Sequence, residues 1–207
     1  MEFSLPAITF SFNLVIIKAE GTLGVAVYSI VKYVCSVMNM VLIGVTQGAQ
    51  PLMSLYHGKG ETELFSYTYL LGIRTNIIIP VILTALYFVF SDGIVSLFHS
   101  GNPELTTLTT RMVRQYPLAY IAIGATLMNI LFFQTTERNI FSAAISALCC
   151  IGYIQVFLLI SVYIFNYKVL YLTFFFGELC HLVISQILVR QTKRMESKDI
   201  QTIAKTV

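Results

Sequence analysis

Long apolar runs separated by short polar segments make up most of this 207-residue chain. Backbone groups in lipid must form their hydrogen bonds internally, so such runs predict membrane helices, and about 20 residues cross a ~30 Å hydrocarbon core. The pattern predicts six spans, at about 3–17, 23–56, 69–98, 113–134, 140–165 and 169–189. We therefore expect an all-α integral membrane bundle of six transmembrane helices over residues 1–190, followed by a cytoplasmic tail at 191–207.

The composition agrees with a lipid environment. Hydrophobic residues make up 57% of the chain and charged residues 11%, with a mean hydropathy of +0.78, whereas a soluble domain has about 25% charged residues. The lipid bilayer is therefore the predicted main partner. The net charge of +3 gives no footprint for nucleic acid, and the four cysteines lack the spacing of a metal site or a disulfide framework. Without HExxH, GxGD, Ser/Lys-dyad or phosphate-loop motifs, we predict no enzyme and no cofactor.

The basic residues near the span ends indicate an orientation. An even number of helices places both termini on one side of the membrane. That side carries seven basic residues: Lys59, Arg138, Arg190, Lys193, Arg194, Lys198 and Lys205. The other side carries four: Lys18, Arg111, Arg114 and Lys168. Cytoplasmic loops carry an excess of lysine and arginine, so the pattern predicts a multi-pass protein of the cell membrane with both termini in the cytoplasm.

The second predicted span carries a stripe of polar side chains. At about 100° per residue they fall within an arc of about 100°: Tyr28, Lys32, Ser36, Asn39, Thr46, Gln47 and Gln50. Each intramembrane polar group needs a partner or water, so the stripe predicts either a cavity wall or hydrogen bonds between helices. For the amides alone, interhelical hydrogen bonds are the commoner arrangement. Lys32 lies 9–10 residues into its helix (23–56), and a buried ammonium costs several kcal/mol, which favours a water-filled cavity.

Small and helix-breaking residues mark the second and third spans: Gly44, Gly48, Pro51 and Pro80. The glycines form a GxxxG pattern beside the polar stripe, which predicts the close approach of another helix. Each proline lacks the N–H that would bond the carbonyl four residues earlier, on Gln47 and Asn76 respectively. We expect bends at both prolines, with the freed carbonyls lining a cavity or meeting a neighbour's donors.

The sixth predicted span carries a carboxylate and an imidazole on one helix face. Glu178 and His181 are three residues apart, and Ser185 follows one turn further on. Such a pair could relay protons or bind a cation. It could equally satisfy its own hydrogen bonds together with a neighbouring helix, and the sequence leaves both interpretations open.

Four segments in series resemble the multidrug and toxic compound extrusion (MATE) family. The segment "GVAVYSIVKYVCSVMNMVLIGVTQGAQPLMSLYHGKGETE" resembles the family's eighth helix, with its G-x-x-Q-G-x-Q-P pattern. "FHSGNPELTTLTTRMVRQYPLAYIAIG" resembles the start of the tenth helix, and "FFQTTERNIFSAAISAL" the turn into the eleventh. "FNYKVLYLTFFFGELCHLVISQIL" is similar to the closing helix. The order and spacing hold over about 20–195.

The resemblance implies one lobe of a larger transporter. Members of the family have twelve helices in two pseudo-symmetric six-helix lobes, and this chain resembles helices seven to twelve. The family exports drug-like organic cations in exchange for H⁺ or Na⁺, through a cavity between its lobes. The polar stripe is then one cavity wall, and a missing N-terminal six-helix lobe supplies the other. We therefore expect the chain to be inactive alone.

The chain departs from the family pattern in one respect. Some members place acidic coupling residues in the seventh and tenth helices, whereas the corresponding segments here contain none. This difference predicts the coupling acid in the missing lobe.

Two alternatives remain open. The first is a lobe of a lipid-linked oligosaccharide flippase of the same superfamily, whose cavities tend to be strongly cationic, as Lys32 and Arg74 would suggest. The second is a non-transporting membrane remnant, suggested by six helices without a partner lobe. The "GVTQGAQP" and "NPEL" segments favour the exporter.

Overall fold

The computed structural model describes residues 4–97, 103–164 and 170–206, and almost all of these are helical. The elements are α1 (Ser4–Gly58), α2 (Thr62–Val89), α3 (Ser91–Leu97), α4 (Pro103–Gln115), the 3₁₀ turn η1 (Tyr116–Leu118), α5 (Ala119–Thr135), α6 (Asn139–Ala147), the π-helical turn η2 (Leu148–Tyr153), α7 (Ile154–Tyr163) and α8 (Leu172–Thr206). Within the described ranges they form an all-α bundle, as the apolar runs predict.

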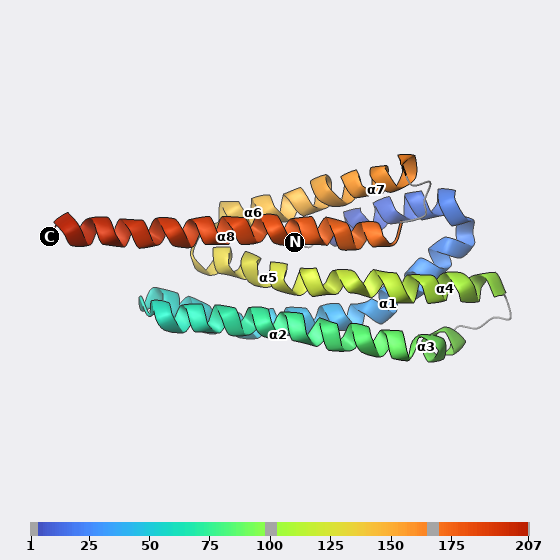
Figure 1. Cartoon of the computed structure of the whole chain (residues 1–207), viewed down its shortest axis with the longest axis horizontal. Helices are drawn as coiled ribbons and strands as arrows, with labels where there is room; N and C mark the ends of the chain where they lie inside the picture. The colour runs from blue at the N-terminus through green and yellow to red at the C-terminus, as the bar shows by residue number, and fades with distance from the viewer. Residues whose placement is uncertain (1–3, 98–102, 165–169, 207) are drawn as a thin grey trace.

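The first two predicted spans are the two arms of α1, which reverses direction at Gly21 (Figure 1). Gly21 has φ 68° and ψ −159°, a backbone conformation that glycine adopts readily and other residues rarely adopt. The remaining predicted spans correspond to α2 with α3, α4 with α5, α6 with α7, and α8. The described chain therefore passes along the bundle six times.

The helices extend beyond the apolar runs that predict them. The third predicted span starts at 69, whereas α2 begins at Thr62, and the fourth starts at 113, whereas α4 begins at Pro103. The last helix continues through the polar tail to Thr206. Hydropathy marks the part of a helix that lies in lipid, and polar residues can continue the same helix into water.

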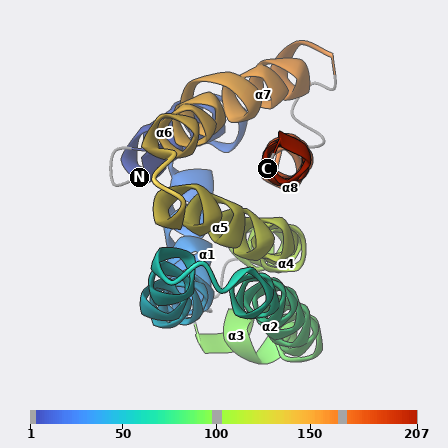
Figure 2. The same cartoon turned by 90° about the vertical axis from the view of Figure 1, so that its left-hand side faces the viewer.

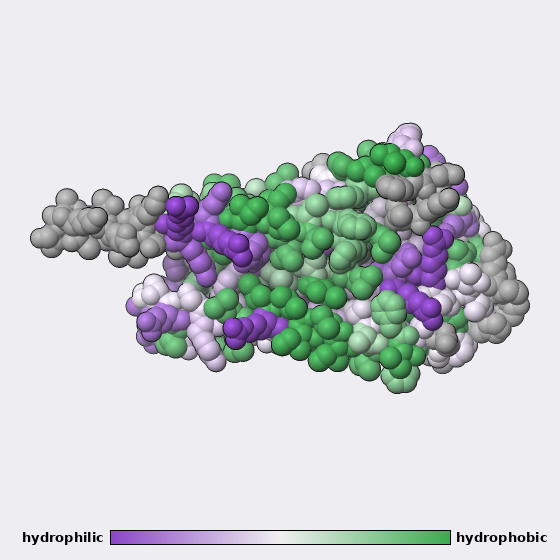
Figure 3. Space-filling view, in the orientation of Figure 1, coloured by the Kyte–Doolittle hydropathy of each residue, from purple (hydrophilic) through white to green (hydrophobic). Residues whose placement is uncertain are grey.

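The surface is arranged as expected for a membrane protein. Four described helical segments are long and apolar enough to cross a bilayer: Ile8–Gly58, Thr62–Val89, Thr106–Thr135 and Leu172–Met195. Figure 3 shows apolar side chains across the middle of the molecule and polar ones toward both ends. The long axis of the bundle therefore lies along the membrane normal, with exposed side chains such as Leu70 and Ile78 facing lipid.

The centre of the bundle is α5, which packs against α1, α2, α6 and α8 (Figure 2). Its closest neighbour contacts are at glycines. A Cβ atom on Gly124 would lie 2.0 Å from the carbonyl oxygen of Asn76, and one on Gly72 would lie 2.3 Å from Cε of Met128. Because Pro80 has no N–H for the Asn76 carbonyl, that oxygen projects toward α5, where Gly124 leaves room for it. These two glycines allow α2 and α5 to approach closely.

The predicted GxxxG contact is not made within the described chain. Gly44 and Gly48 are exposed, and no heavy atom lies within 4 Å of a Cβ built on either glycine. Close packing of another helix on Gly44 and Gly48 therefore stays a prediction, and the partner helix would lie outside the described residues. Both proline-containing helices continue past the proline: α1 runs through Pro51 to Gly58, and α2 through Pro80 to Val89.

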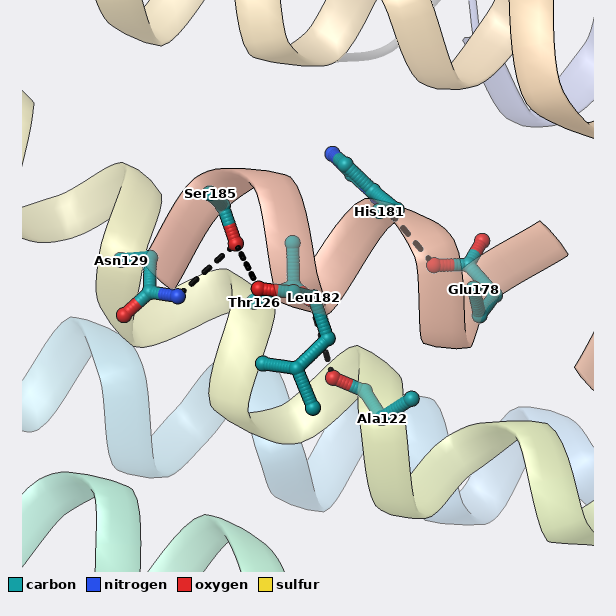
Figure 4. Close-up of polar contacts among 7 residues, drawn as sticks. All are labelled: Ala122, Thr126, Asn129, Glu178, His181, Leu182 and Ser185. Carbon is teal, nitrogen blue, oxygen red and sulfur yellow. Dashed lines mark hydrogen bonds and ion pairs between the residues drawn. The ribbon is translucent and has the colours of Figure 1, made fainter. Parts of the chain in front are cut away.

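A buried amide joins three helices. Asn129 of α5 accepts a hydrogen bond from the hydroxyl of Tyr69 of α2, at 2.6 Å, through its Oδ1. Its Nδ2 donates to Oγ of Ser185 of α8, at 2.8 Å (Figure 4). Asn129 is fully buried, so these bonds satisfy polar groups that lipid could not. This amide holds the helices together.

Candidate functional site

A cavity of about 410 Å³ lies between the two arms of α1 and α5, α6 and α8. Its size falls within the range of about 300–1,000 Å³ that is typical of small-molecule sites. Exposed Gln47 and Gln50 line it, so it opens to the surface along the second arm of α1. The opening lies on the same arm as the uncovered Gly44 and Gly48.

Five of the seven polar side chains predicted on one face of the second span line this cavity: Lys32, Asn39, Thr46, Gln47 and Gln50. Tyr28 and Ser36 are not among the lining residues. Tyr28 is buried, with its hydroxyl 3.4 Å from that of Tyr116. The Ser36 hydroxyl instead donates to the backbone carbonyl of Tyr33, at 2.6 Å. The polar stripe is therefore continuous on the helix, but only part of it reaches the cavity.

Lys32 joins the two arms of α1 inside the cavity. Its ammonium donates a hydrogen bond to Oγ1 of Thr9, on the first arm, and both residues line the cavity. The reversal at Gly21 brings these residues together although they are 23 positions apart. Lys32 is the one basic side chain among the lining residues apart from His181.

Aromatic rings form one wall of the cavity. Tyr116 of η1 and Phe174 of α8 are stacked, with centroids 4.7 Å apart and an interplanar angle of 11°. Tyr120 of α5 lies edge-on to both rings, with centroids 6.4 Å away. All three line the cavity. The faces of such rings carry partial negative charge and attract organic cations.

Glu178 and His181 lie against this wall on α8 and also line the cavity. Each is 5% exposed, and His181 Nδ1 lies 3.3 Å from Glu178 Oε2 (Figure 4). The His181 ring points away from α5 (Figure 4), and its centroid is 6.2 Å from that of Tyr153 in η2. Nε2 of His181 is buried without a hydrogen-bond partner. The structure thus brings the predicted pair to the polar stripe of α1, across a shared cavity.

The described residues contain no group of three or more His, Cys, Asp or Glu side chains that could hold a metal ion. The cavity instead combines an apolar and aromatic wall, amides, one ammonium, and one carboxylate paired with an imidazole. This arrangement suits a small organic molecule that carries charge.

One protein-family model identifies the family of this chain. The family model described as MatE matches residues 1–160. The chain belongs to the MatE family. A search of curated protein sequences finds no significant match.

Solved structures show the same fold. A multidrug-resistance MATE transporter of the MOP superfamily in an outward-facing conformation matches with a TM-score of 0.87 and 17% identity, over 95% of this chain and 44% of its own. An inward-facing MATE transporter matches with a TM-score of 0.83 and 16% identity, over 90% and 43% of the two chains. This MatE chain spans less than half the length of these transporters and has the fold of one lobe.

A third structure comes from Pyrococcus furiosus. It is a MOP-superfamily transporter for which a reversed polarity of the binding pocket suggests a different function. It matches with a TM-score of 0.84 and 17% identity, over 92% of the MatE chain and 43% of its own.

The sequence did not point to the aromatic wall. Tyr116, Tyr120 and Phe174 lie in apolar runs of two different spans, where aromatic residues normally pack in the core. A signal was available only for the polar members of the site, because polar side chains are rare in membrane helices.

Proposed function

We propose that this chain is the C-terminal six-helix lobe of a MATE-type antiporter, which exports small drug-like organic cations from the cell in exchange for H⁺ or Na⁺. Its place is the cell membrane, with both termini in the cytoplasm. Membership of the MatE family supports transport. The observation that carries the substrate class is the aromatic wall formed by Tyr116, Tyr120 and Phe174 in the cavity.

Cation recognition follows from the chemistry of the lining residues. The aromatic rings that border the cavity suit a flat, weakly hydrated cation, for which cation–π contacts in a desolvated site contribute about 2 kcal/mol or more. Among the described residues, Glu178 is the one acidic side chain that lines the cavity, and it supplies a negative charge near the wall. Binding would then combine ring stacking with charge attraction.

The uncovered side of the cavity supports a second lobe as the partner. Gln47 and Gln50 are exposed at its mouth, and Gly44 and Gly48 are exposed on the same arm of α1. In lipid, exposed amides would lack hydrogen-bond partners. A missing N-terminal lobe that packs on this side would cover the amides and use the glycines for close contact.

A matched pair of substitutions on α8 tests the substrate class. Phe174 is 3% exposed and lines the cavity, whereas Phe176 is 45% exposed and stacks on Phe157 at the outer surface. In a complete transporter that contains this lobe, Phe174→Ala should reduce ethidium efflux about tenfold or more, because a desolvated cation–π contact is lost. Phe176→Ala should leave efflux near its original level. Equal effects of the two substitutions would contradict the proposal.

Lys32 favours a second candidate, a flippase-like lobe for an anionic lipid-linked head group. Its ammonium lines the cavity, and a cationic cavity attracts an anion. The two candidate functions predict opposite effects of Lys32→Gln on binding. Loss of this positive charge should strengthen binding of ethidium, whereas it should weaken binding of an anionic substrate. Fluorescence anisotropy with ethidium and with an anionic dye separates them.

A further inference from the structure

We propose that the Glu178–His181 pair is the proton-binding site of this cavity, and that the proton is taken up at Nε2 of His181. The consequence for transport, that a proton and an organic cation exclude each other, rests on the proposed function. The proton site itself rests on the geometry of α8.

The hydrogen bond within the pair fixes where the proton can go. An ionised carboxylate only accepts hydrogen bonds, so when Glu178 is ionised the 3.3 Å contact between Nδ1 and Oε2 places the hydrogen on Nδ1 of His181. In the neutral ring, Nε2 then carries the free lone pair. Nε2 is buried and has no hydrogen-bond partner, and the residue lines the cavity. A base without a partner is therefore buried in a residue of the cavity wall.

Of the ionisable groups around the cavity, the Glu178–His181 pair is the one that we expect to change charge with pH. Among the described residues, the ionisable side chains that line the cavity or contact the pair are Tyr120 of α5, Tyr116 of η1, Tyr153 of η2 and Lys32 of α1. The phenols are neutral at ordinary pH. Along its length, α7 carries no acidic or basic side chain. Histidine is the side chain that ordinarily changes charge between about pH 5 and 8.

Protonation changes what the carboxylate can bind. A hydronium ion transfers a proton to Nε2, which leaves water and an imidazolium whose Nδ1–H remains bonded to Glu178. The positive ring then neutralises the one carboxylate of the cavity. An organic cation that entered would meet a net positive charge from Lys32 and His181. Proton and organic cation therefore compete for one negative charge, which is the coupling that an antiporter needs. This lobe would then hold a coupling group of its own, whereas the family pattern predicts the coupling acid in the missing lobe.

Nitrogen-15 NMR of the histidine ring tests the proton site directly. The purified full chain would carry His57→Gln and His99→Gln, so that His181 is the single histidine observed. We expect Nε2 without hydrogen at pH 8 and both ring nitrogens protonated at pH 5. A ring that stays neutral throughout, or that carries its hydrogen on Nε2 at pH 8, overturns the proposal.

In a complete transporter that contains this lobe, ethidium binding tests the competition, with His57→Gln as the matched control because His57 is exposed and outside the cavity. Fluorescence anisotropy should show affinity falling by roughly 5- to 150-fold between pH 8 and pH 5, the usual range of coupling between two sites. His181→Gln should abolish this fall, and His57→Gln should keep it. An unchanged fall in His181→Gln overturns the proposed competition.

The two measurements separate the proton site from the export proposal. If ethidium fails to bind at every pH while His181 still titrates, the substrate class is wrong and the proton site stands. If ethidium binds but the ring stays neutral, the proton site is wrong and the substrate class stands. The NMR measurement leaves His181 unaltered, so it holds whether or not His181→Gln folds.

Discussion

At the scale of single residues, the tightest constraint lies where α2 meets α5. Pro80 leaves the Asn76 carbonyl without its intrahelical donor, and Gly124 supplies the space into which that oxygen projects. The Asn76 side chain turns to α1, where Nδ2 donates to Oγ1 of Thr46 at 3.0 Å. One residue thus links three helices through both its backbone and its side chain.

Alanine substitutions at three glycines should change the free energy of unfolding in different directions and by different amounts. Gly124→Ala should lower the free energy of unfolding by about 1–3 kcal/mol, because its Cβ meets backbone that cannot move. Gly72→Ala should cost less, since it meets the flexible end of Met128. Gly48→Ala has open space and should raise the stability of the isolated chain by up to about 1 kcal/mol. Thermal unfolding in detergent measures all three, and a larger loss at Gly48 than at Gly124 would contradict this account.

At the scale of elements, α1 is the helix that makes the cavity. Its two arms meet at Gly21 and are joined across the cavity by Lys32 and Thr9. The second arm presents amides to the cavity on one face and apolar side chains to lipid on another. The cavity wall and the membrane-facing surface are thus two faces of one helix.

Cysteine labelling tests this division of α1. In a complete transporter, cysteines placed at Asn39 and Gln50 should react with a water-soluble maleimide, because both positions line the cavity. The control is Met40, which follows Asn39 directly and is 71% exposed on the apolar surface. A cysteine there faces lipid and should react far more slowly. Equal rates at Asn39 and Met40 would show that the amide face is not in contact with water.

At the scale of the whole molecule, the chain has the fold of one lobe and spans 44% of a MATE transporter with which it aligns. We expect the chain expressed alone in an efflux-deficient host to leave sensitivity to ethidium unchanged, because its cavity opens to the surface along the second arm of α1. Growth inhibition by ethidium is the measurement, with a complete MATE transporter as the positive control. Clear resistance from the chain alone would refute this expectation.

The sequence predicts the helical bundle well because backbone groups in lipid must form their hydrogen bonds internally, so long apolar runs become helices. Apolar runs mark every pass, and the family resemblance is confirmed by the MatE match. The site is harder to predict. A helical wheel treats α1 as uniform along its length, so it places Tyr28 and Asn39 on one face, although only Asn39 reaches the cavity. The wheel also cannot tell the exposed Gly44 from the tightly packed Gly124, because neighbours from distant segments decide the difference.

The two glycine contacts between α2 and α5 also have a mechanical consequence. They lie one turn apart, and the glycine alternates between the helices: Gly72 faces Met128, and Asn76 faces Gly124. Sliding one helix by a turn, about 5.4 Å, would in one direction set Asn76 against Met128, where neither side leaves room. These contacts therefore oppose sliding of α2 past α5 in that direction. We expect the two helices to tilt or rotate together when this lobe moves.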